Sequence, residues 1–466
     1  MLLNVHQLGE AAESQTANWR RSCLCLDVAT RVSEVRCSQV ISLHYLETTA
    51  QKSSMFASAI IANKRDGMSL SREEIEFMIT GFVAETVPKY QMSAWAMAVL
   101  CRGMDSREIA DLTECMLNSG IRLRRATDRP RVDKHSTGGL GDKTSLILAP
   151  LLACFELDVP MLSGRGLGIT GGTLDKLEAL QGYRCDLSES EINRQLQSIG
   201  CVITGTTPEI TPADKKLYGL RDVTGTVPSI ALITASIMSK KLAESLDALM
   251  LDVKFGSGAF MRTRDDAEQL AASLIEAGSR MNVNTQALLS DMNQPLGRMV
   301  GNACEVNESL DILRGSGPTE VRELTLQLCA PLLVATGKST SIDDALQQLA
   351  NRLDDGHALR RFQQMVESQS GTFVDELPLA SPSTFESDAS GELVALDGQL
   401  LGQAVIELGG GRRQLEDQVD HQVGLEMLVK LGETVDHRQP LIRLFARNAQ
   451  SRSNAEQLLR RAIIIR

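Results

Sequence analysis

A glycine-rich segment in the first third of the chain has the residue types needed to bind an anion. Its sequence is Lys134-His135-Ser136-Thr137-Gly138-Gly139-Leu140-Gly141-Asp142-Lys143-Thr144-Ser145, and it leads from a predicted strand into a predicted helix. Glycines let backbone N–H groups approach a ligand, and the following helix presents its positive end. Lys134 and the hydroxyl groups of Ser136 and Ser145 add charge-assisted hydrogen bonds. Taken alone, such a loop is equally well explained as a turn with surface hydroxyls.

A second loop of the same kind, from Ser163 to Thr173, follows the next predicted strand and enters another predicted helix. Neighbouring parallel strands bring such loops together at the carboxyl edge of a sheet, where open α/β folds bind ligands. We therefore expect two helix ends to hold one phosphate, with Thr173 also acting as an N-cap. Arg165 is expected to be structural, paired with Asp175 or Glu178.

Two polar pairs lie at helical spacing later in the chain. Tyr218 and Arg221 are three residues apart, and Ser236 and Lys240 are four apart, so each pair shares one face of a predicted helix. By itself this spacing is typical of a solvated helix surface.

The elements that would position these residues begin with a small helical bundle. Ser71 and Glu74 form a capping box at the start of one helix. Two more helices are predicted over 93–101 and 106–119, ending at Gly103 and Gly120 as C-caps.

After Pro130, short apolar strands alternate with helices, which predicts βαβ units and a mainly parallel sheet. Strands are predicted at 132–134 and 159–162, and helices at 143–155 and from 173. Residues 213–243 are helical again before strands at 249–254 and 287–291, so the helical domain is predicted to be discontinuous. Beyond about residue 373, β-like segments are predicted at 392–396, 403–408 and 441–445.

The resulting fold class is α/β with a separate helical domain. A small discontinuous α domain is hinged to a large mixed-sheet α/β domain, and a C-terminal α+β subdomain follows. The expected boundaries are an N-terminal extension at 1–54, the helical domain at 55–128 and 212–245, the α/β domain at 129–211 and 246–372, and the C-terminal subdomain at 373–466.

Composition excludes several classes of protein. The chain has 466 residues, and 48 Lys and Arg against 59 Asp and Glu give a net charge of −11, which disfavours nucleic acid as a partner. No apolar run approaches the roughly 18–20 residues of a membrane span. The ten cysteines are scattered and match no disulfide or metal spacing, and no secretory signal is evident, so we expect a cytoplasmic protein.

These motifs together resemble one family. Ser163 to Glu178 is similar to the signature of the thymidine and pyrimidine nucleoside phosphorylases, and K-H-S-T-G-G-x-G-D, Y-x-x-R-D-V-T and L-I-T-A-S-I-M-S-K-K match the same family in order. The resemblance extends from about Met55 to about Ala446. It implies phosphorolysis of pyrimidine nucleosides such as thymidine or uridine, with inorganic phosphate as co-substrate, neither an organic cofactor nor a catalytic metal, and a homodimer formed through the helical domain.

The resemblance also implies a role for each matching position. The phosphate-binding positions are Lys134, Ser136, Ser145, Ser163 and Thr173. The pyrimidine-binding positions are His135, Leu167, Tyr218, Arg221, Ile233, Ser236 and Lys240, of which Leu167 and Ile233 would pack against the base. Among them His135, Arg221 and Lys240 are the expected catalytic residues, because they would stabilise the negative charge that develops on the departing base.

The chain departs from the family pattern at several positions. Ile169 stands where the family usually has His, and Ala231 stands where it usually has Pro. Gly225 interrupts a segment that usually reads T-A-T-V in the family.

Some family members hold a monovalent cation with oxygens at the positions of Gly141, Lys143, Leu296, Met299 and Glu308, with Thr where this chain has Lys143. Two interpretations of Lys143 stay open. Either its ammonium group substitutes for the cation, or it points to solvent at a helix start.

Three alternatives to a nucleoside phosphorylase remain. One is a phosphoribosyltransferase of the related anthranilate type, which lacks the Y-x-x-R and S-x-x-x-K pairs and needs magnesium sites. Another is a phosphorylase acting on a nucleoside monophosphate, which calls for an extra basic pocket. The third is a non-catalytic pyrimidine-binding protein, since a fold alone does not prove activity.

Overall fold

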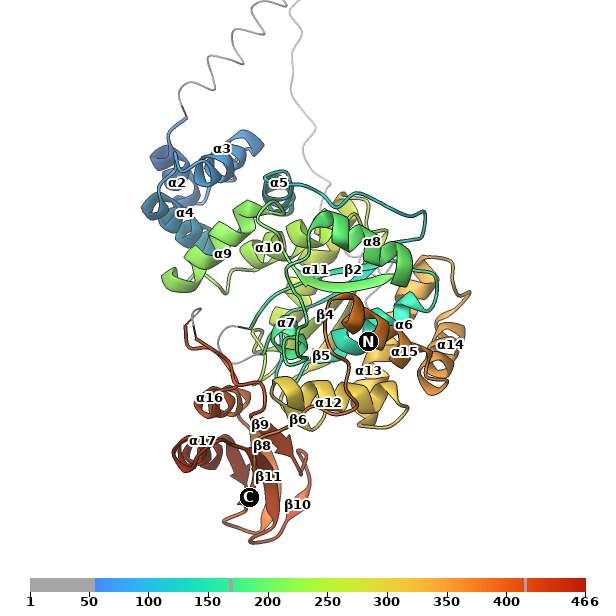
Figure 1. The fold of residues 1–466 in the computed structure, drawn as a ribbon. Helices are drawn as coiled ribbons and strands as arrows, with labels where there is room; N and C mark the ends of the chain where they lie inside the picture. The colour runs from blue at the N-terminus through green and yellow to red at the C-terminus, as the bar shows by residue number, and fades with distance from the viewer. Residues whose placement is uncertain (1–54, 167–170, 415–416) are drawn as a thin grey trace, which may run out of the picture.

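The computed structural model describes residues 55–166, 171–414 and 417–466. In Figure 1 the described chain forms a helical unit, a central α/β unit and a C-terminal unit, one above the other. Two expectations fall outside the described residues: the N-terminal extension at 1–54, and the side chains of Leu167 and Ile169.

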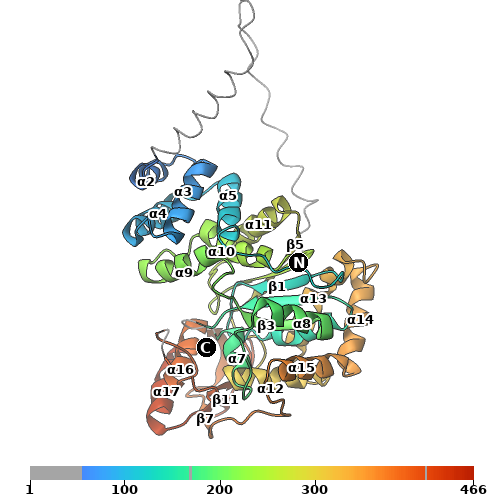
Figure 2. The same cartoon turned by 45° about the horizontal axis from the view of Figure 1, so that its top comes forward.

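The helical unit combines two stretches of the chain, as expected. Its helices are α2 (Ala57–Arg65), α3 (Arg72–Val83), α4 (Lys89–Arg102), α5 (Ser106–Leu117), α9 (Pro212–Thr224) and α10 (Ile230–Ala243). One buried apolar cluster joins side chains from α2–α5, such as Trp95 and Leu112, to Leu217 of α9 and Leu232 of α10. Figure 2 shows α9 and α10 lying between the first four helices and the sheet.

The helix boundaries follow the predicted caps with two differences. Ser71 caps α3 and forms the expected capping box with Glu74. Helix α4 begins earlier than predicted, after the N-cap Pro88. The prediction of Gly120 as the C-cap of α5 is wrong, because Asn118 occupies that position. Gly120 is instead a site of close approach, where an added Cβ would collide with the backbone of Glu209.

The α/β unit is built on parallel strands. They are β1 (Val132–Ser136), β2 (Val159–Ser163), β3 (Cys201–Gly205), β4 (Ala248–Phe255) and β5 (Asn284–Asp291). β1 pairs with β4 and β4 with β5, while β2 pairs with β3. Strand β3 was not predicted. A single parallel bridge, between Arg131 and Asp158, links β1 to β2.

Helices cover both faces of these strands. They are α6 (Thr144–Ala153), α7 (Thr173–Leu177), α8 (Glu189–Ile199), α11 (Arg264–Arg280), α12 (Asn302–Leu313), α13 (Thr319–Ala335), α14 (Ile342–Asp354) and α15 (His357–Ser368). Met250 of β4 packs into the cluster that contains α6 and α13, and its neighbours Leu249 and Leu251 pack into the cluster that contains α11. No helix in the described ranges is long and apolar enough to span a membrane.

The C-terminal unit is α+β, as expected. Its elements are β6 (Met299–Val300), β7 (Pro382–Glu386), β8 (Gly391–Leu396), α16 (Gly398–Leu408), β9 (Gly424–Met427), β10 (Thr434–Val435), β11 (Pro440–Phe445), α17 (Ala449–Ala462) and β12 (Ile463–Ile465). The prediction of a β-like segment at 403–408 is wrong. That segment belongs to α16, which Asp397 caps at the start and Gly409 ends in the left-handed conformation.

Candidate active site

The first glycine-rich loop connects β1 to α6 as expected. Gly138 and Gly141 both have positive φ values, 93° and 76°, which only glycine adopts without strain. The Gly138 N–H donates to Ser136 Oγ at 3.2 Å. The loop therefore turns sharply at the carboxyl end of β1, and Ser136 is held at the turn.

Lys134 lies at the centre of this loop. Its side chain is buried, and its Nζ donates to Ser145 Oγ at 3.3 Å and lies 3.7 Å from Asp142 Oδ2. Burial alone would raise the pKa of Asp142, but the charges of Lys134, Lys254 and Lys176 together lower that pKa well below its ordinary value. The loop thus holds an ionised carboxylate among three lysines, a strongly polar setting for an anion.

The second loop is organised by Asp175. Its Oδ2 accepts hydrogen bonds from the N–H groups of Gly166 at 2.6 Å and Gly172 at 3.2 Å. Its Oδ1 accepts from the guanidinium group of Arg412, which comes from the C-terminal unit. Ser163 lies at the end of β2, where this loop begins.

Two expectations about the second loop need correction. Gly172, not Thr173, is the N-cap of α7, and Thr173 is the first helical residue. Helix α7 has five residues, so its dipole contributes less to anion binding than that of a full-length helix. Arg165 forms an ion pair with Glu178 at 2.5 Å, which agrees with the structural role expected for Arg165.

Lys176 joins the two loops. Its buried Nζ donates to the backbone carbonyl of Asp142 in the first loop and forms an ion pair with Glu305 at 2.9 Å. The structure therefore brings both loops together at the carboxyl ends of β1 and β2. Sequence reasoning missed Lys176, and its position three residues after Thr173 gave no signal of this contact.

Helix α10 presents Ser236 and Lys240 as one cluster. The Lys240 Nζ donates to Ser236 Oγ at 3.0 Å and to Asp214 Oδ2 at 2.5 Å. Asp214 lies on α9, four residues before Tyr218, so both project from the same side of that helix. Asp214 is not among the residues expected from the sequence, although its spacing of four from Tyr218 is a usable signal.

The remaining residues that we expect to bind the base differ in exposure. Tyr218 is 46% exposed, and Ile233 is partly buried on α10. Arg221 is buried, and its guanidinium donates to the carbonyls of Thr226, Val227 and Leu232 at 3.3, 2.6 and 3.0 Å. Arg221 has five N–H donors, so three bonds to described residues leave two for a ligand. It braces the connection between α9 and α10, a role that the sequence pattern did not indicate.

His135 lies on β1 between Lys134 and Ser136. Burial lowers its pKa well below 6.5, and the charges of Lys241, Lys240 and Lys134 lower it further. Lys240 belongs to the α10 cluster and Lys134 to the first loop, so the positive charges of both clusters act on the imidazole. It is neutral near pH 7, and its N–H group can still donate a hydrogen bond.

Lys143 is fully buried, so the interpretation that it points to solvent is wrong. Its Nζ donates to the carbonyl oxygens of Leu296 at 2.7 Å and Met299 at 3.0 Å, and it forms an ion pair with Glu308. An added Cβ at Gly141 would lie 2.9 Å from the Leu296 oxygen, so the first loop packs directly on this segment. An ammonium group therefore occupies the centre of the expected cation site.

Comparison with known proteins identifies the family. Profiles of the glycosyl transferase family match at residues 58–120 (helical bundle domain) and 128–359 (a/b domain), and that of the pyrimidine nucleoside phosphorylase C-terminal domain matches at 393–466. Pyrimidine-nucleoside phosphorylases of Staphylococcus haemolyticus and Bacillus subtilis are 43% and 42% identical to the chain, over 86% of its length and 94% and 93% of theirs. The chain belongs to the pyrimidine-nucleoside phosphorylase family.

The fold is shared more widely than the family. The crystal structure of anthranilate phosphoribosyltransferase from Thermus thermophilus aligns with a TM-score of 0.57 at 17% identity, covering 67% of this chain and 99% of that one. At this identity the likeness concerns the fold alone.

Two departures from the pyrimidine-nucleoside phosphorylase pattern have a structural setting here. Gly225 is the C-cap of α9 with a φ of 66°, so it ends that helix in the left-handed conformation. Ala231 is buried in the first turn of α10.

Proposed function

We propose that this chain catalyses the phosphorolysis of pyrimidine nucleosides, which yields the free base and a pentose 1-phosphate. The observation that carries the proposal is the presence of two polar pairs, Lys134–Ser145 at the first loop and Ser236–Lys240 on α10, whose lysine charges both act on His135. One cluster has the chemistry of a phosphate site and the other offers donors for a base. A reaction that joins phosphate to the sugar and releases the base needs both.

Phosphate is proposed to bind at the carboxyl ends of β1 and β2. Lys134, Ser136 and Ser145 would hold it from the first loop, and Ser163 and Thr173 from the second. A phosphate oxygen attacks the anomeric carbon of the sugar, and the bond from that carbon to the base nitrogen breaks. Its electron pair stays on the base, which is later protonated.

The base is proposed to bind against α9 and α10. Lys240, held by Asp214, and the two free donors of Arg221 would stabilise the negative charge on the leaving base, while the His135 N–H donates to a base oxygen. Tyr218 and Ser236 would fix the ring edge. Ile233 would pack against the ring, and we assign Leu167 the same part, although it lies outside the described residues.

Activity decides between this proposal and its alternatives. Purified protein should release free base from thymidine, uridine or deoxyuridine only when inorganic phosphate is added. Formation of a phosphoribosyl product from anthranilate would favour the phosphoribosyltransferase alternative. Cleavage of a nucleoside monophosphate would favour a phosphorylase that acts on nucleoside monophosphates. Binding of pyrimidines without turnover of any of these substrates would favour a non-catalytic protein.

We also propose the division into domains given by the sequence, and a homodimer formed through the helical domain. Tyr90 and Met97 lie seven residues apart on one face of α4 and are 73% and 41% exposed, which supports an interface there. Sedimentation of the protein, and of a Tyr90→Glu variant, tests it.

The described cysteines are all free thiols, which supports a reducing, cytoplasmic compartment.

A further inference from the structure

Strands β1 and β2 separate just before they reach the proposed phosphate residues. The bridge at Arg131 and Asp158 joins their beginnings, where the Val132 N–H donates to the Asp158 carbonyl at 2.9 Å. Beyond it, β1 pairs with β4 and β2 pairs with β3. Within the described residues, the edge of β2 that faces β1 therefore lacks strand partners at Leu162, the residue before Ser163.

Two side chains from the end of α10 satisfy the backbone of Leu162. The Leu162 N–H donates to Glu244 Oε1 at 3.0 Å, and its carbonyl accepts from Lys241 Nζ at 3.0 Å. Lys241 also forms ion pairs with Glu244, at 2.7 Å, and with Asp133 of β1. These three side chains, Asp133, Lys241 and Glu244, form what we call the buried trio, and they fill the gap between the two strands.

The trio contains two carboxyl groups and one ammonium group, each at most 2% exposed. Among the described residues, neither Asp133 Oδ1 nor Glu244 Oε2 has a hydrogen-bond donor. A single proton between the two carboxyl groups would satisfy both oxygens and make the trio neutral, as a buried site requires.

The direction of the pKa shift of Glu244 agrees with one proton between the two carboxyl groups. Burial, then repulsion from Asp133, raises the pKa of Glu244 well above 4.5, and a hydrogen bond with the Asp133 carboxyl group acts in the same direction. The attraction of Lys241 opposes this shift without cancelling it. Arg131, whose guanidinium donates to the Glu244 carbonyl at 3.1 Å, lies next to the trio, and the imidazole of His135, on which the charge of Lys241 acts, is neutral.

The trio links three of the elements that carry the proposed active site, β1, β2 and α10. Asp133 precedes Lys134 on β1, Leu162 precedes Ser163 on β2, and Lys241 follows Lys240 on α10. We propose that Lys241, together with one proton shared between Asp133 and Glu244, is a positioning residue that fixes α10 to the opened end of the sheet. It thereby anchors the C-terminal end of α10, the end from which the base-binding residues of that helix approach the phosphate-binding residues when the two units close. This inference rests on the site roles proposed above.

Two variants of Glu244 separate positioning from simple stabilisation. Glu244→Met keeps the Asp133–Lys241 ion pair, and therefore the charge balance, but removes the bond to the Leu162 N–H. We expect kcat to fall about tenfold, while the KM values for phosphate and for nucleoside stay within about twofold. A small displacement of the base-binding residues relative to the phosphate-binding residues slows the reaction, whereas each set of residues still binds its own substrate. Glu244→Gln keeps an acceptor for Lys241 and Leu162 and a donor for Asp133, so it should restore kcat.

Matched changes at the exposed Glu268 of α11, to Met and to Gln, serve as controls. An unchanged kcat per folded molecule in Glu244→Met would overturn the positioning role, and so would an equal loss in Glu244→Gln. Lys241→Met removes the links to both strands, and its kcat should fall further. If Lys241→Met does not fold, the Glu244 pair still decides the question.

The shared proton has a separate test that needs no substrate. A carboxyl group whose pKa is higher in the folded protein stabilises it at low pH, and this contribution is lost as pH rises from about 4.5 through the folded-state pKa. Glu244→Gln removes that loss, so its melting temperature relative to the unmodified protein should be higher at pH 8 than at pH 5. An equal difference at both pH values would overturn the proton assignment. Because this measurement is independent of turnover, failure of the proposed function is distinguishable from failure of this inference.

Discussion

Replacing Lys143 by threonine should turn an enzyme that is indifferent to potassium into one that depends on it. In the structure the Lys143 ammonium group is surrounded by the Leu296 and Met299 carbonyls and the Glu308 carboxylate. These oxygens belong to the segment against which the first glycine-rich loop packs. The side chain therefore supplies, through a covalent tether, the positive charge that these oxygens need.

The size of the effect follows from what remains after the substitution. Glu308 would keep two backbone donors, the Arg298 N–H at 2.9 Å and the Met299 N–H at 3.2 Å, but would lose its only ion-pair partner in the described chain. Removing one partner of a buried ion pair costs about 3–5 kcal/mol. A potassium ion at about a hundredfold excess over its dissociation constant would return about 2.7 kcal/mol. Stability and turnover should therefore be partly restored by potassium.

The assay compares potassium chloride with tetramethylammonium chloride at equal ionic strength, with turnover and melting temperature as readouts. The unmodified protein should respond equally to both salts, whereas Lys143→Thr should be activated and stabilised by potassium. Lys338→Thr is the control, because it removes an exposed ion pair with Glu156 worth about 0–1 kcal/mol. Potassium activation of the unmodified protein would refute the reasoning, as would a Lys143→Thr variant that responds equally to both salts.

Four further outcomes are expected. Lys134→Ala and Lys240→Ala should each lose phosphorolysis with unchanged circular dichroism, because each removes a charge from the reacting site, and activity within tenfold of the parent would contradict the assignment. Small-angle scattering should show a more compact particle with phosphate plus a base analogue than without, since the two half-sites lie on different units; identical curves would count against closure. Deleting residues 1–54 should leave turnover and melting temperature nearly unchanged, and a large drop would show that this segment packs on the fold. Because the pKa of His135 lies well below 6.5, the pH profile of kcat should show no step near pH 6.5, and a step there that disappears in His135→Gln would contradict this.

The sequence predicted the parts of this fold that depend on local rules. The capping box at Ser71 and the alternation of strands and helices after Pro130 are properties of neighbouring residues, and both are confirmed. The segment at 403–408 was mistaken for a strand because a short apolar run does not distinguish the two structures. The earlier Asp397 cap and the following Gly409 identify it as the end of a longer helix.

The site was predictable in outline but not in its ion pairing. Motif order located the loops, yet partners such as Arg412 for Asp175 are 237 residues apart, and no spacing rule connects them. The sequence also left the direction of Lys143 undecided, since a lysine at a helix start is usually solvated. Only the packed fold shows that Glu308 lies within its reach. The separation of β1 from β2 is likewise a tertiary property.

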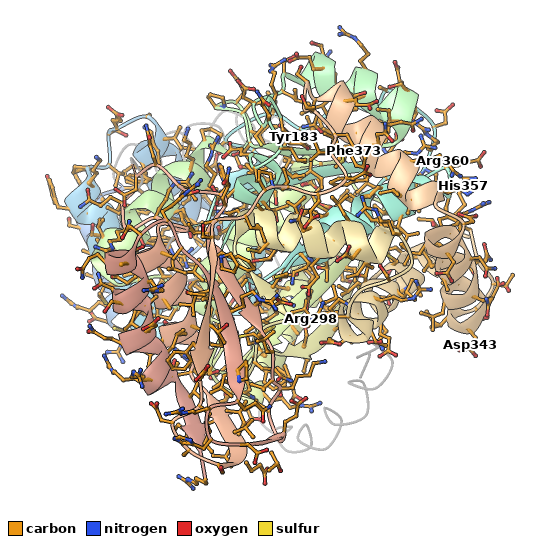
Figure 3. The ribbon with its side chains drawn as sticks, turned by 60° about the horizontal axis from the view of Figure 1, so that its bottom comes forward. Tyr183, Arg298, Asp343, His357, Arg360 and Phe373 are labelled. Atoms are coloured by element: carbon orange, nitrogen blue, oxygen red, sulfur yellow. The ribbon has the colours of Figure 1, made fainter. Side chains whose placement is uncertain are left out.

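The attachment of the C-terminal unit limits how this protein can be recombined with its relatives. Strand β6, which lies between β5 and α12 in the chain, pairs with β9, and the Arg298 carbonyl accepts from the Met427 N–H at 2.8 Å. In Figure 3 Arg298 lies between the strands of the C-terminal unit and the helices of the α/β unit. Arg412 adds a contact to the second loop. A chimaera that exchanges only residues 373–466 would therefore interrupt a shared sheet and leave Asp175 facing a foreign loop, so the junction and both contact segments have to be inherited together.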